Sequence, residues 1–170
     1  ITIVAAPNAG TLSGGQAICI GGSTTFSNPG SGGSWSSSNG SVAPINSSTG
    51  AISGIAAGTA TMTYTVIGSA GCSNATATRT VTVSAPPSAG TLSGNQAICV
   101  GGASTFTSTV SGGSWSSGNT GIATINATTG AISGVAAGTA TMTYTVTGTG
   151  GCSNASATRT VTVGTPPSAG

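Results

Sequence analysis

The stretch GTATMTYTV at residues 58–66 decides the fold, and it returns unchanged at residues 138–146. Threonine occupies every second position, and alanine, methionine, tyrosine and valine occupy the positions between. This period of two is typical of a β-strand with one polar face and one buried face. β-Branched threonine and valine and aromatic tyrosine are favoured on a pleated surface. The stretch therefore predicts a long, central, hairpin-forming strand of a small β-sandwich.

The two stretches belong to a repeat that covers almost the whole 170-residue chain. The halves align without a gap, so that Trp35 corresponds to Trp115 and Arg79 to Arg159. A repeat of this length holds several strands and can bury its own core, so we expect separate domains rather than stacked solenoid units. The predicted segments are the last strand of a preceding repeat at 1–4, a linker at 5–10, the first repeat at 11–84, a linker at 85–90, the second repeat at 91–164 and a linker at 165–170.

The linkers on both sides of the second repeat contain paired prolines. Proline fixes φ and favours extended geometry, so such joints act as semi-rigid spacers. We therefore expect successive repeats to follow one another in a roughly end-to-end rod. Residues 1–4 have a second interpretation, as an N-terminal strand that is donated to a neighbouring subunit.

Short alternating segments separated by turn residues fill each repeat, and no segment shows the 3.6-residue apolar period of a helix. We predict an all-β fold with about seven short strands in each repeat and essentially no helix. The strands expected in the first repeat are 11–13 continuing through 16–20, 23–27, 34–37, 42–46, 51–53, 58–66 and 75–83. The aromatic residues expected in the two cores are Phe26, Trp35, Tyr64, Phe106, Trp115 and Tyr144.

Charged side chains are almost absent from the chain, which contains no Asp, Glu, His or Lys and only two arginines. General acid–base catalysis and nucleophilic triads depend on the missing residue types, as do zinc sites with histidine and calcium sites. Two arginines cannot form the basic surface that nucleic acids require. No apolar run reaches the length of a membrane helix. We therefore expect no enzyme, no cofactor, no metal, no nucleic-acid partner and no membrane span.

Four cysteines occupy equivalent positions, two in each repeat. In a chain of strands and glycine turns they predict one structural disulfide per repeat, Cys19–Cys72 and Cys99–Cys152. Two alternatives stay open: four free buried thiols, or pairing across the repeats such as Cys72–Cys99. A disulfide implies an oxidising environment, so we expect an exported protein.

The threonines of the repeated stretch are expected to face outward together. They are Thr59, Thr61, Thr63 and Thr65 in the first repeat and Thr139, Thr141, Thr143 and Thr145 in the second. Such a row is a candidate contact face for ice, for a glycan or for another copy of the chain, and near-zero net charge removes repulsion between copies. The simpler interpretation is a solvated strand face.

Arg79 shares its strand parity with the residues expected to face the core. A buried guanidinium without partners is costly. We therefore expect its stem to lie on Trp35 or Tyr64, with its charged end in water or on backbone carbonyls. The alternative is a strand bulge that turns it outward.

Four sites match the pattern for attachment of a glycan to asparagine, at Asn46, Asn74, Asn126 and Asn154. Chance matches are expected in a chain rich in Ser, Thr and Asn. Covalent glycans on Ser or Thr would explain how a nearly uncharged surface stays soluble.

The chain resembles a known family over about half of each repeat. The matching residues of the first repeat are 34–39 (SWSSSN), 42–43 (VA) and 49–63 (TGAISGIAAGTATMT), with counterparts at 114–119, 122–123 and 129–143. These residues resemble the group 2 bacterial immunoglobulin-like domains. The flanking residues 94–102 and 150–155 are similar to a cysteine-bearing variant in very long surface proteins of gliding bacteria. The family pattern usually includes acidic residues, and their absence here argues against calcium dependence.

The resemblance implies tandem immunoglobulin-like β-sandwiches in a spacer, stalk or adhesin on the bacterial cell surface, often exported by type IX secretion. We therefore predict a non-enzymatic, extracellular repeat that forms a stiff stalk or filament and has neighbouring repeats as partners. One alternative is a self-assembling multi-chain filament with lateral or donor-strand contacts. The other is a glycan- or ice-binding module that uses the threonine faces.

Overall fold

The computed structural model describes residues 5–166. The predicted strand at residues 1–4 and the end of the last predicted linker lie outside these residues. The described residues contain fifteen β-strands and no helix, which confirms the predicted all-β fold. The chain forms two compact units. Unit 1 contains the residues up to Pro86 together with Thr149–Cys152, and unit 2 contains Pro87–Gly148 and the residues from Ser153 onward.

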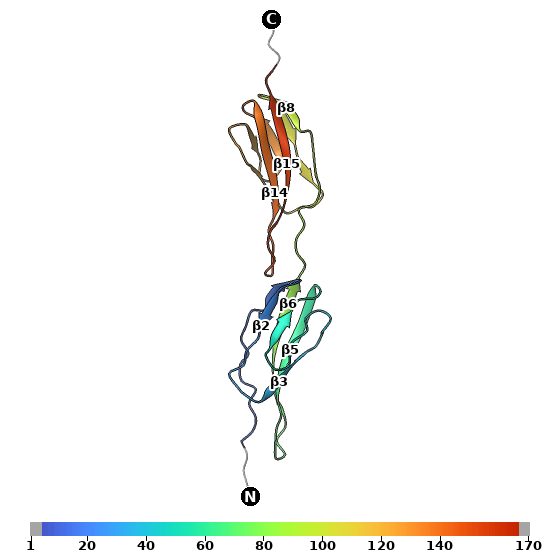
Figure 1. Ribbon diagram of the computed structural model, residues 1–170, viewed down its shortest axis with the longest axis vertical. Coiled ribbons are helices and arrows are strands. Elements are labelled where there is room, and N and C mark those ends of the chain that lie inside the picture. The colour runs from blue at the N-terminus through green and yellow to red at the C-terminus, as the bar shows by residue number, and fades with distance from the viewer. Residues whose placement is uncertain (1–4, 167–170) are drawn as a thin grey trace. The chain divides into compact units, whose positions relative to one another are not determined.

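Unit 1 is built on a four-stranded sheet in the order β1-β6-β5-β3 (Figure 1). A smaller sheet pairs β2 with β4. Strands β5 and β6 form the long antiparallel hairpin, and β1 adds to β6 in the parallel direction. The bounds of the strands are Ala17–Cys19 for β1, Ser23–Thr25 for β2, Gly33–Ser37 for β3, Ala51–Ser53 for β4, Gly58–Val66 for β5 and Ala75–Ser84 for β6.

Unit 2 has an equivalent four-stranded sheet in the order β11-β14-β15-β8, and it has two smaller sheets, β12-β13-β9 and β10-β7. Strands β14 and β15 form the long hairpin, and β8 joins β15 in parallel. The bounds of the strands are Leu92–Ser93 for β7, Ala97–Cys99 for β8, Ala103–Thr105 for β9, Thr107–Ser108 for β10, Ser114–Ser117 for β11, Ala123–Ile125 for β12, Ala131–Gly134 for β13, Gly138–Val146 for β14 and Ala155–Gly164 for β15.

Three strands of unit 2 have no counterpart of full length in unit 1. Strands β7 and β10 correspond there to an isolated bridge between Ser13 and Ser27, and β12 is the third. Ala123–Ile125 pairs with β13 over three residues, whereas the predicted strand at residues 42–46 is reduced to an isolated bridge between Ile45 and Ile52. The backbone N–H of Ser53 donates to the Pro44 carbonyl at 3.2 Å. Pro44 has no N–H with which to return the bond. Proline in place of Thr124 therefore explains the shorter pairing in unit 1.

The core of each unit lies between its sheets, and the long strands supply one wall of it. In β5, Ala60, Met62 and Tyr64 are buried while the threonines alternate with them. Phe26 is fully buried, and the ring centroids of Trp35 and Tyr64 lie 4.9 Å apart. The six aromatic residues expected in the cores are all buried, with Phe106, Trp115 and Tyr144 repeating the cluster in unit 2.

Candidate functional site

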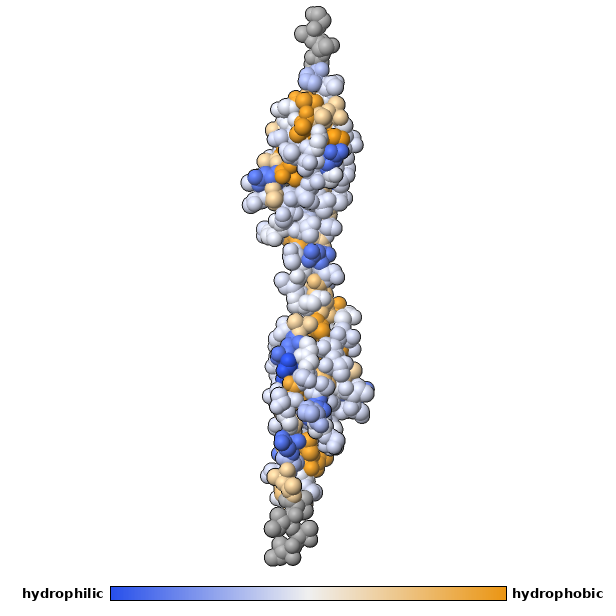
Figure 2. Space-filling model, turned by 90° about the vertical axis from the view of Figure 1, so that its left-hand side faces the viewer, coloured by the Kyte–Doolittle hydropathy of each residue, from blue (hydrophilic) through white to orange (hydrophobic). Residues whose placement is uncertain are grey.

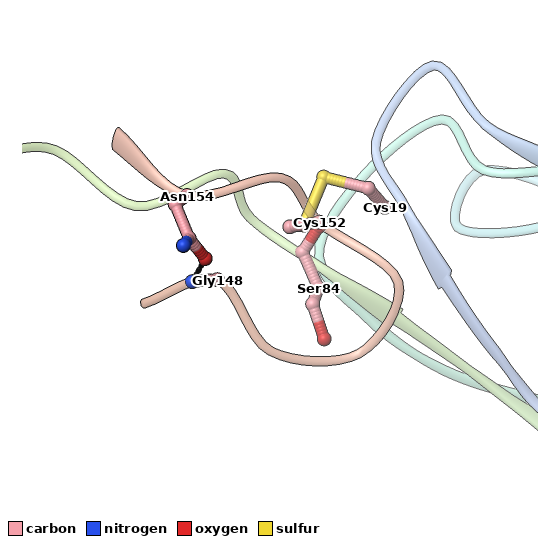
Figure 3. The surroundings of a disulfide bond; sticks show 5 residues. All are labelled: Cys19, Ser84, Gly148, Cys152 and Asn154. Carbon is pink, nitrogen blue, oxygen red and sulfur yellow. Dashed lines mark hydrogen bonds between the residues drawn. A yellow bond between two sulfur atoms is a disulfide. The ribbon is translucent and has the colours of Figure 1, made fainter. Parts of the chain in front are cut away.

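A disulfide bond joins Cys19 to Cys152, with 4.8 Å between their Cα atoms (Figure 3). Cys72 is a half-buried free thiol and Cys99 an exposed one. The structure therefore corrects the predicted pairing of Cys19 with Cys72 and of Cys99 with Cys152. Of the two alternatives that the sequence left open, pairing across the repeats describes this bond, because Cys19 belongs to the first repeat and Cys152 to the second. The bonded pair is not Cys72–Cys99, the example given for that alternative.

The strand that ends each repeat keeps the two cysteines of that repeat apart. Cys19 is the last residue of β1, and it pairs in register with Ser84, the last residue of β6. Cys72 lies in the hairpin before β6, beyond the opposite end of that strand. Ten residues of extended strand span about 30 Å, whereas Cα atoms joined through a disulfide lie within about 7 Å of each other. The same distance along β15 separates Cys152 from Cys99.

The bond is instead made within unit 1, to which the segment Thr149–Cys152 belongs although β14 and β15 on either side of it belong to unit 2. Gly151 lies against β1, where a Cβ on it would stand 3.3 Å from the Ala17 carbonyl oxygen and 3.4 Å from the Ile18 Cα. Gly150 lies against Ser84, whose hydroxyl a Cβ at position 150 would strike. Two residues without side chains thus allow this backbone to approach the strand ends closely.

The hairpin that carries Cys152 is closed by its own hydrogen bonds. The Gly148 N–H donates to the Asn154 side-chain oxygen at 3.0 Å (Figure 3). The Cys152 N–H donates to the Thr149 carbonyl at 3.1 Å. The Sγ atom of Cys152 lies 3.5 Å from the Ser84 carbonyl oxygen. The cysteine is therefore held by a defined turn rather than by a loose loop.

The Arg79 side chain contacts an aromatic ring and two backbone carbonyls of unit 1. Its guanidinium lies 5.5 Å from the centroid of the Phe26 ring, and it donates to the carbonyls of Leu12 at 3.2 Å and Gly14 at 2.8 Å. The contact with carbonyls agrees with expectation, but the aromatic partner is Phe26 rather than Trp35 or Tyr64. The pairing of β5 with β6 is continuous, so no bulge turns the side chain outward. Arg159 repeats the arrangement over Phe106.

Replacing Arg79 by alanine is expected to lower the free energy of unfolding of unit 1 by about 1–2 kcal/mol. Two hydrogen bonds from a charged donor and one cation–π contact are lost, and partial exposure of the side chain reduces their value. Lysine should retain only part of the stability, because one ammonium group does not reproduce the fork of the guanidinium. Urea unfolding of both variants measures the loss, with Arg159→Ala as the matched change in unit 2. An unchanged midpoint for Arg79→Ala would contradict this structural role.

A cavity of about 330 Å³ lies at one end of unit 1, beside Trp35, Tyr64 and the loop at 30–33. Unit 2 has an equivalent cavity of about 360 Å³. Trp35 and Tyr64 are only 6 % and 5 % exposed, so their rings offer little surface to a ligand. The Tyr64 hydroxyl is already engaged, since it accepts from the Gly33 N–H at 3.0 Å and donates to the Gly30 carbonyl at 3.3 Å. The cavity therefore lacks both a charged group and an aromatic platform.

The threonine rows of the long hairpins are paired with each other. In unit 1, Thr59, Thr61, Thr63 and Thr65 stand opposite Thr82, Thr80, Thr78 and Thr76. The row on β6 is exposed, whereas the row on β5 is exposed at Thr59 and half-buried at the other three positions. In unit 2, Thr139 and Thr141 are exposed and Thr143 and Thr145 are half-buried. The face of the molecule drawn in Figure 2 is mostly near neutral in hydropathy, with few strongly hydrophilic atoms.

The four asparagines in glycosylation patterns are exposed, and each supports a turn. The side-chain oxygens of Asn46 and Asn126 each accept from two backbone N–H groups in their turns. Those of Asn74 and Asn154 accept from the backbone N–H groups of Gly68 and Gly148 across the loops of the long hairpins. Each of these bonds uses the amide oxygen, whereas a glycan would be attached through the amide nitrogen.

Two absences hold for the described part of the chain. No group of three or more His, Cys, Asp or Glu lies together there in a way that could hold a metal ion. No helix between residues 5 and 166 is long and apolar enough to cross a membrane.

The chain matches no protein-family model and no curated protein sequence. Among solved structures, the C-terminal 282-residue fragment of intimin, in complex with the intimin-binding domain of the translocated intimin receptor, matches with a TM-score of 0.56 and 14 % identity. The match covers 90 % of this chain and 63 % of that fragment.

Two further structures are similar at lower TM-scores. Domains 1–6 of the surface layer protein SbsC match over 96 % of this chain and 29 % of theirs, with 17 % identity and a TM-score of 0.45. A SusE-like surface located polysaccharide binding protein from the heparin utilisation locus of Bacteroides thetaiotaomicron matches over 90 % of this chain and 34 % of its own, with 16 % identity and a TM-score of 0.33.

At such low identities a likeness in structure supports the fold alone, and of the three only the intimin fragment is close enough to do so. The chain spans well under two thirds of the other two proteins and slightly less than two thirds of that fragment. Together with the described strands and sheets, the likeness establishes an all-β, immunoglobulin-like β-sandwich fold.

Proposed function

We propose that the chain is a structural repeat of an extracellular bacterial surface protein and serves as a spacer in a stalk or filament. The observation that carries the proposal is the use of its distinctive side chains. Both arginines bind backbone carbonyls of their own unit, and all six aromatic residues are buried. What remains at the surface is chiefly hydroxyl groups, small side chains and backbone, which suit a protein that maintains a distance between other parts.

The finer assignment is to the group 2 bacterial immunoglobulin-like domains, in their cysteine-bearing variant. It is supported by the sequence patterns at residues 34–39 and 49–63 and by their second copies. Repeat boundaries at 11–84 and 91–164 belong to the same proposal. The disulfide supports an oxidising location outside the cytoplasm, and covalent glycans on exposed Ser, Thr or Asn would add to the solubility of a surface with two charges.

A second candidate is a filament of several chains that associate laterally. It is favoured by the cross-strand rows of threonine on the β5–β6 and β14–β15 hairpins, because a flat face of hydroxyl groups with a net charge of only +2 offers little repulsion to another copy. Binding of a glycan or ice by the same face has no further observation in its support.

Immunogold electron microscopy of cells that make the protein tests both candidates. Antibodies against this chain are expected to label intact cells on thin projections outside the envelope. Label that appears only after the cells are permeabilised would exclude the surface role. Projections with the width of one chain favour the spacer, whereas bundles of parallel chains favour lateral association.

A further inference from the structure

Each repeat contains one free cysteine at a position where the other repeat has a bonded one. Cys19 corresponds to Cys99, and Cys152 corresponds to Cys72, yet only the first cysteine of the first repeat and the second cysteine of the second repeat are joined. The two remaining cysteines are free. We infer that Cys99 and the hairpin that carries Cys72 are the two halves of the same joint, and that Cys99 of one copy of the chain forms a disulfide with Cys72 of another.

The strand end at Cys99 has the same backbone structure as the end at Cys19. In unit 1 the Ile20 N–H donates to the Ser84 carbonyl at 2.9 Å, and in unit 2 the Val100 N–H donates to the Gly164 carbonyl at 3.0 Å. Strand β8 pairs with β15 in the register in which β1 pairs with β6. The strand end at Cys99, against which a hairpin would dock, therefore has the same backbone structure as the strand end at Cys19.

The two strand ends differ in solvent exposure, because a hairpin lies over only one of them. Ile18, beside Cys19, is only 6 % exposed, whereas its counterpart Ile98 is half-buried. Cys19 itself is half-buried and Cys99 is exposed. In unit 1 Gly151 lies over Ala17 and Ile18. The corresponding surface of unit 2 is the same docking site without its hairpin.

The hairpin that carries Cys72 is already in the docked conformation. The Gly68 N–H donates to the Asn74 side-chain oxygen at 3.0 Å, as Gly148 does to Asn154. The Cys72 N–H donates to the Ser69 carbonyl at 3.0 Å. Gly71 has a φ of 85° and Gly151 one of 83°. A Cβ on Gly71 would meet nothing within 4 Å, so this surface of the hairpin is free.

The free hairpin and the free strand end also have complementary side-chain sizes, in an arrangement opposite to that of the bonded pair. Gly150 of the docked hairpin lies against Ser84, and a Cβ there would strike the serine hydroxyl. The free hairpin has Ala70 at this position, and the free strand end has Gly164 where the other has Ser84. The methyl group of Ala70 therefore meets a residue that has no side chain. These two differences in residue size favour docking of the hairpin of the first repeat on the strand end of the second.

The bond forms by thiol–disulfide exchange with a low-molecular-weight disulfide such as oxidised glutathione as the oxidant. The Cys99 thiolate attacks one sulfur of glutathione disulfide and releases one glutathione thiolate. The Cys72 thiolate then attacks the Cys99 sulfur of the mixed disulfide and releases the second. The two protons of the protein thiols pass to the two glutathione thiolates. The contact is heterologous, so it extends from copy to copy in one direction.

The disulfide between copies is a property additional to the proposed spacer role. The joint requires an oxidant and a second repeat of this kind, but not a particular location on the cell. A spacer that never forms the joint would remain a spacer.

Two single variants test the pairing while they keep the Cys19–Cys152 bond. Cys72→Ser leaves only Cys99 free, and Cys99→Ser leaves only Cys72 free. The two are mixed in equal amounts at high concentration in a glutathione redox buffer, because no linker raises the effective concentration of the two halves. Non-reducing electrophoresis and intact-mass measurement identify the products. We expect the heterodimer in about twentyfold excess over each homodimer, which is the statistical factor of two multiplied by the tenfold preference that about 1.4 kcal/mol of specific docking supplies.

Statistical amounts of the three dimers, a preference for homodimers, or mixed disulfides with glutathione alone would overturn the inference. The match of Ala70 with Gly164 gives a second test. Gly164→Ser in the Cys72→Ser chain should reduce the heterodimer towards its statistical share, and Ala70→Gly in the partner should restore the excess. Serine occurs naturally at the equivalent position 84, so the Gly164→Ser chain is expected to fold, and circular dichroism checks that it does. No effect of Gly164→Ser would contradict the docking geometry.

Discussion

Replacing Phe26 by alanine is expected to lower the free energy of unfolding of unit 1 by about 3–5 kcal/mol, the usual loss for an aromatic residue in a close-packed core. Phe26 has no exposed surface. It lies 6.3 Å from Trp35 between ring centroids and beneath the Arg79 guanidinium. The substitution therefore leaves a cavity and also removes the apolar partner of the only charged side chain of the unit.

Differential scanning calorimetry measures this effect. A loss of this size should lower the transition of unit 1 by about 12 °C or more. Phe106→Ala is the matched change, because Phe106 occupies the same place against Trp115 and Arg159, and it should lower the transition of unit 2 instead. Phe26→Leu, which retains much of the volume, should lose less and keeps the test readable if alanine prevents folding. Equal shifts of both transitions by Phe26→Ala would contradict the separate cores.

Removing the disulfide with the double change Cys19→Ser and Cys152→Ser is expected to lower the free energy of unfolding by up to about 5 kcal/mol. The bond closes a loop with a sequence separation of 133 residues, and the chain-entropy treatment gives about 5 kcal/mol for a loop of this length. Replacing both cysteines avoids a new free thiol at either position. Guanidinium chloride unfolding under non-reducing conditions gives the value.

The double change Cys72→Ser and Cys99→Ser is the control, since neither residue is bonded in the structure. Its free energy of unfolding should lie within about 0.5 kcal/mol of that of the unchanged chain. Similar large losses in both variants would instead indicate the pairing within each repeat, because each double change removes one cysteine from both Cys19–Cys72 and Cys99–Cys152.

The alternation of residues 58–66 was sufficient to predict the long strand, because a strand with one buried face imposes a period of two on any sequence. The short strands were harder to place. Pro44 lies within a predicted strand and removes one hydrogen-bond donor from it, so that only a bridge remains at Ile45. The second repeat, with Thr124 at this position, has the strand. A direct comparison of the two copies would have revealed the difference.

The environment of Arg79 could be predicted only in part. Its strand parity indicates an inward stem, and the cost of burying a charge indicates carbonyl partners. The choice of Phe26 over Trp35 or Tyr64 depends on which side chains of the opposite sheet lie above Met62 and Arg79, and this is a property of packing between sheets. Periodicity along one strand does not contain that information.

The cysteine pairing was predicted wrongly because a symmetrical repeat suggests symmetrical bonds. The signal that could have corrected it lies in the last strand. Cys72 precedes a ten-residue strand whose far end is next to Cys19, and a strand of that length is too long for one disulfide to bridge. The remaining options place the partner of each cysteine in another repeat. Choosing among them required the course of residues 149–152, which the sequence does not specify.

The bond between Cys19 and Cys152 also determines how the chain would respond to a pulling force. Residues 19–152 form a covalent ring, so tension applied beyond the two cysteines passes through the sulfur atoms and not through the backbone between them. The enclosed segment, with a separation of 133 residues, corresponds to a contour length of about 440 Å when fully extended. This length stays hidden under load until the disulfide is reduced, so the redox state sets how far the molecule can be stretched.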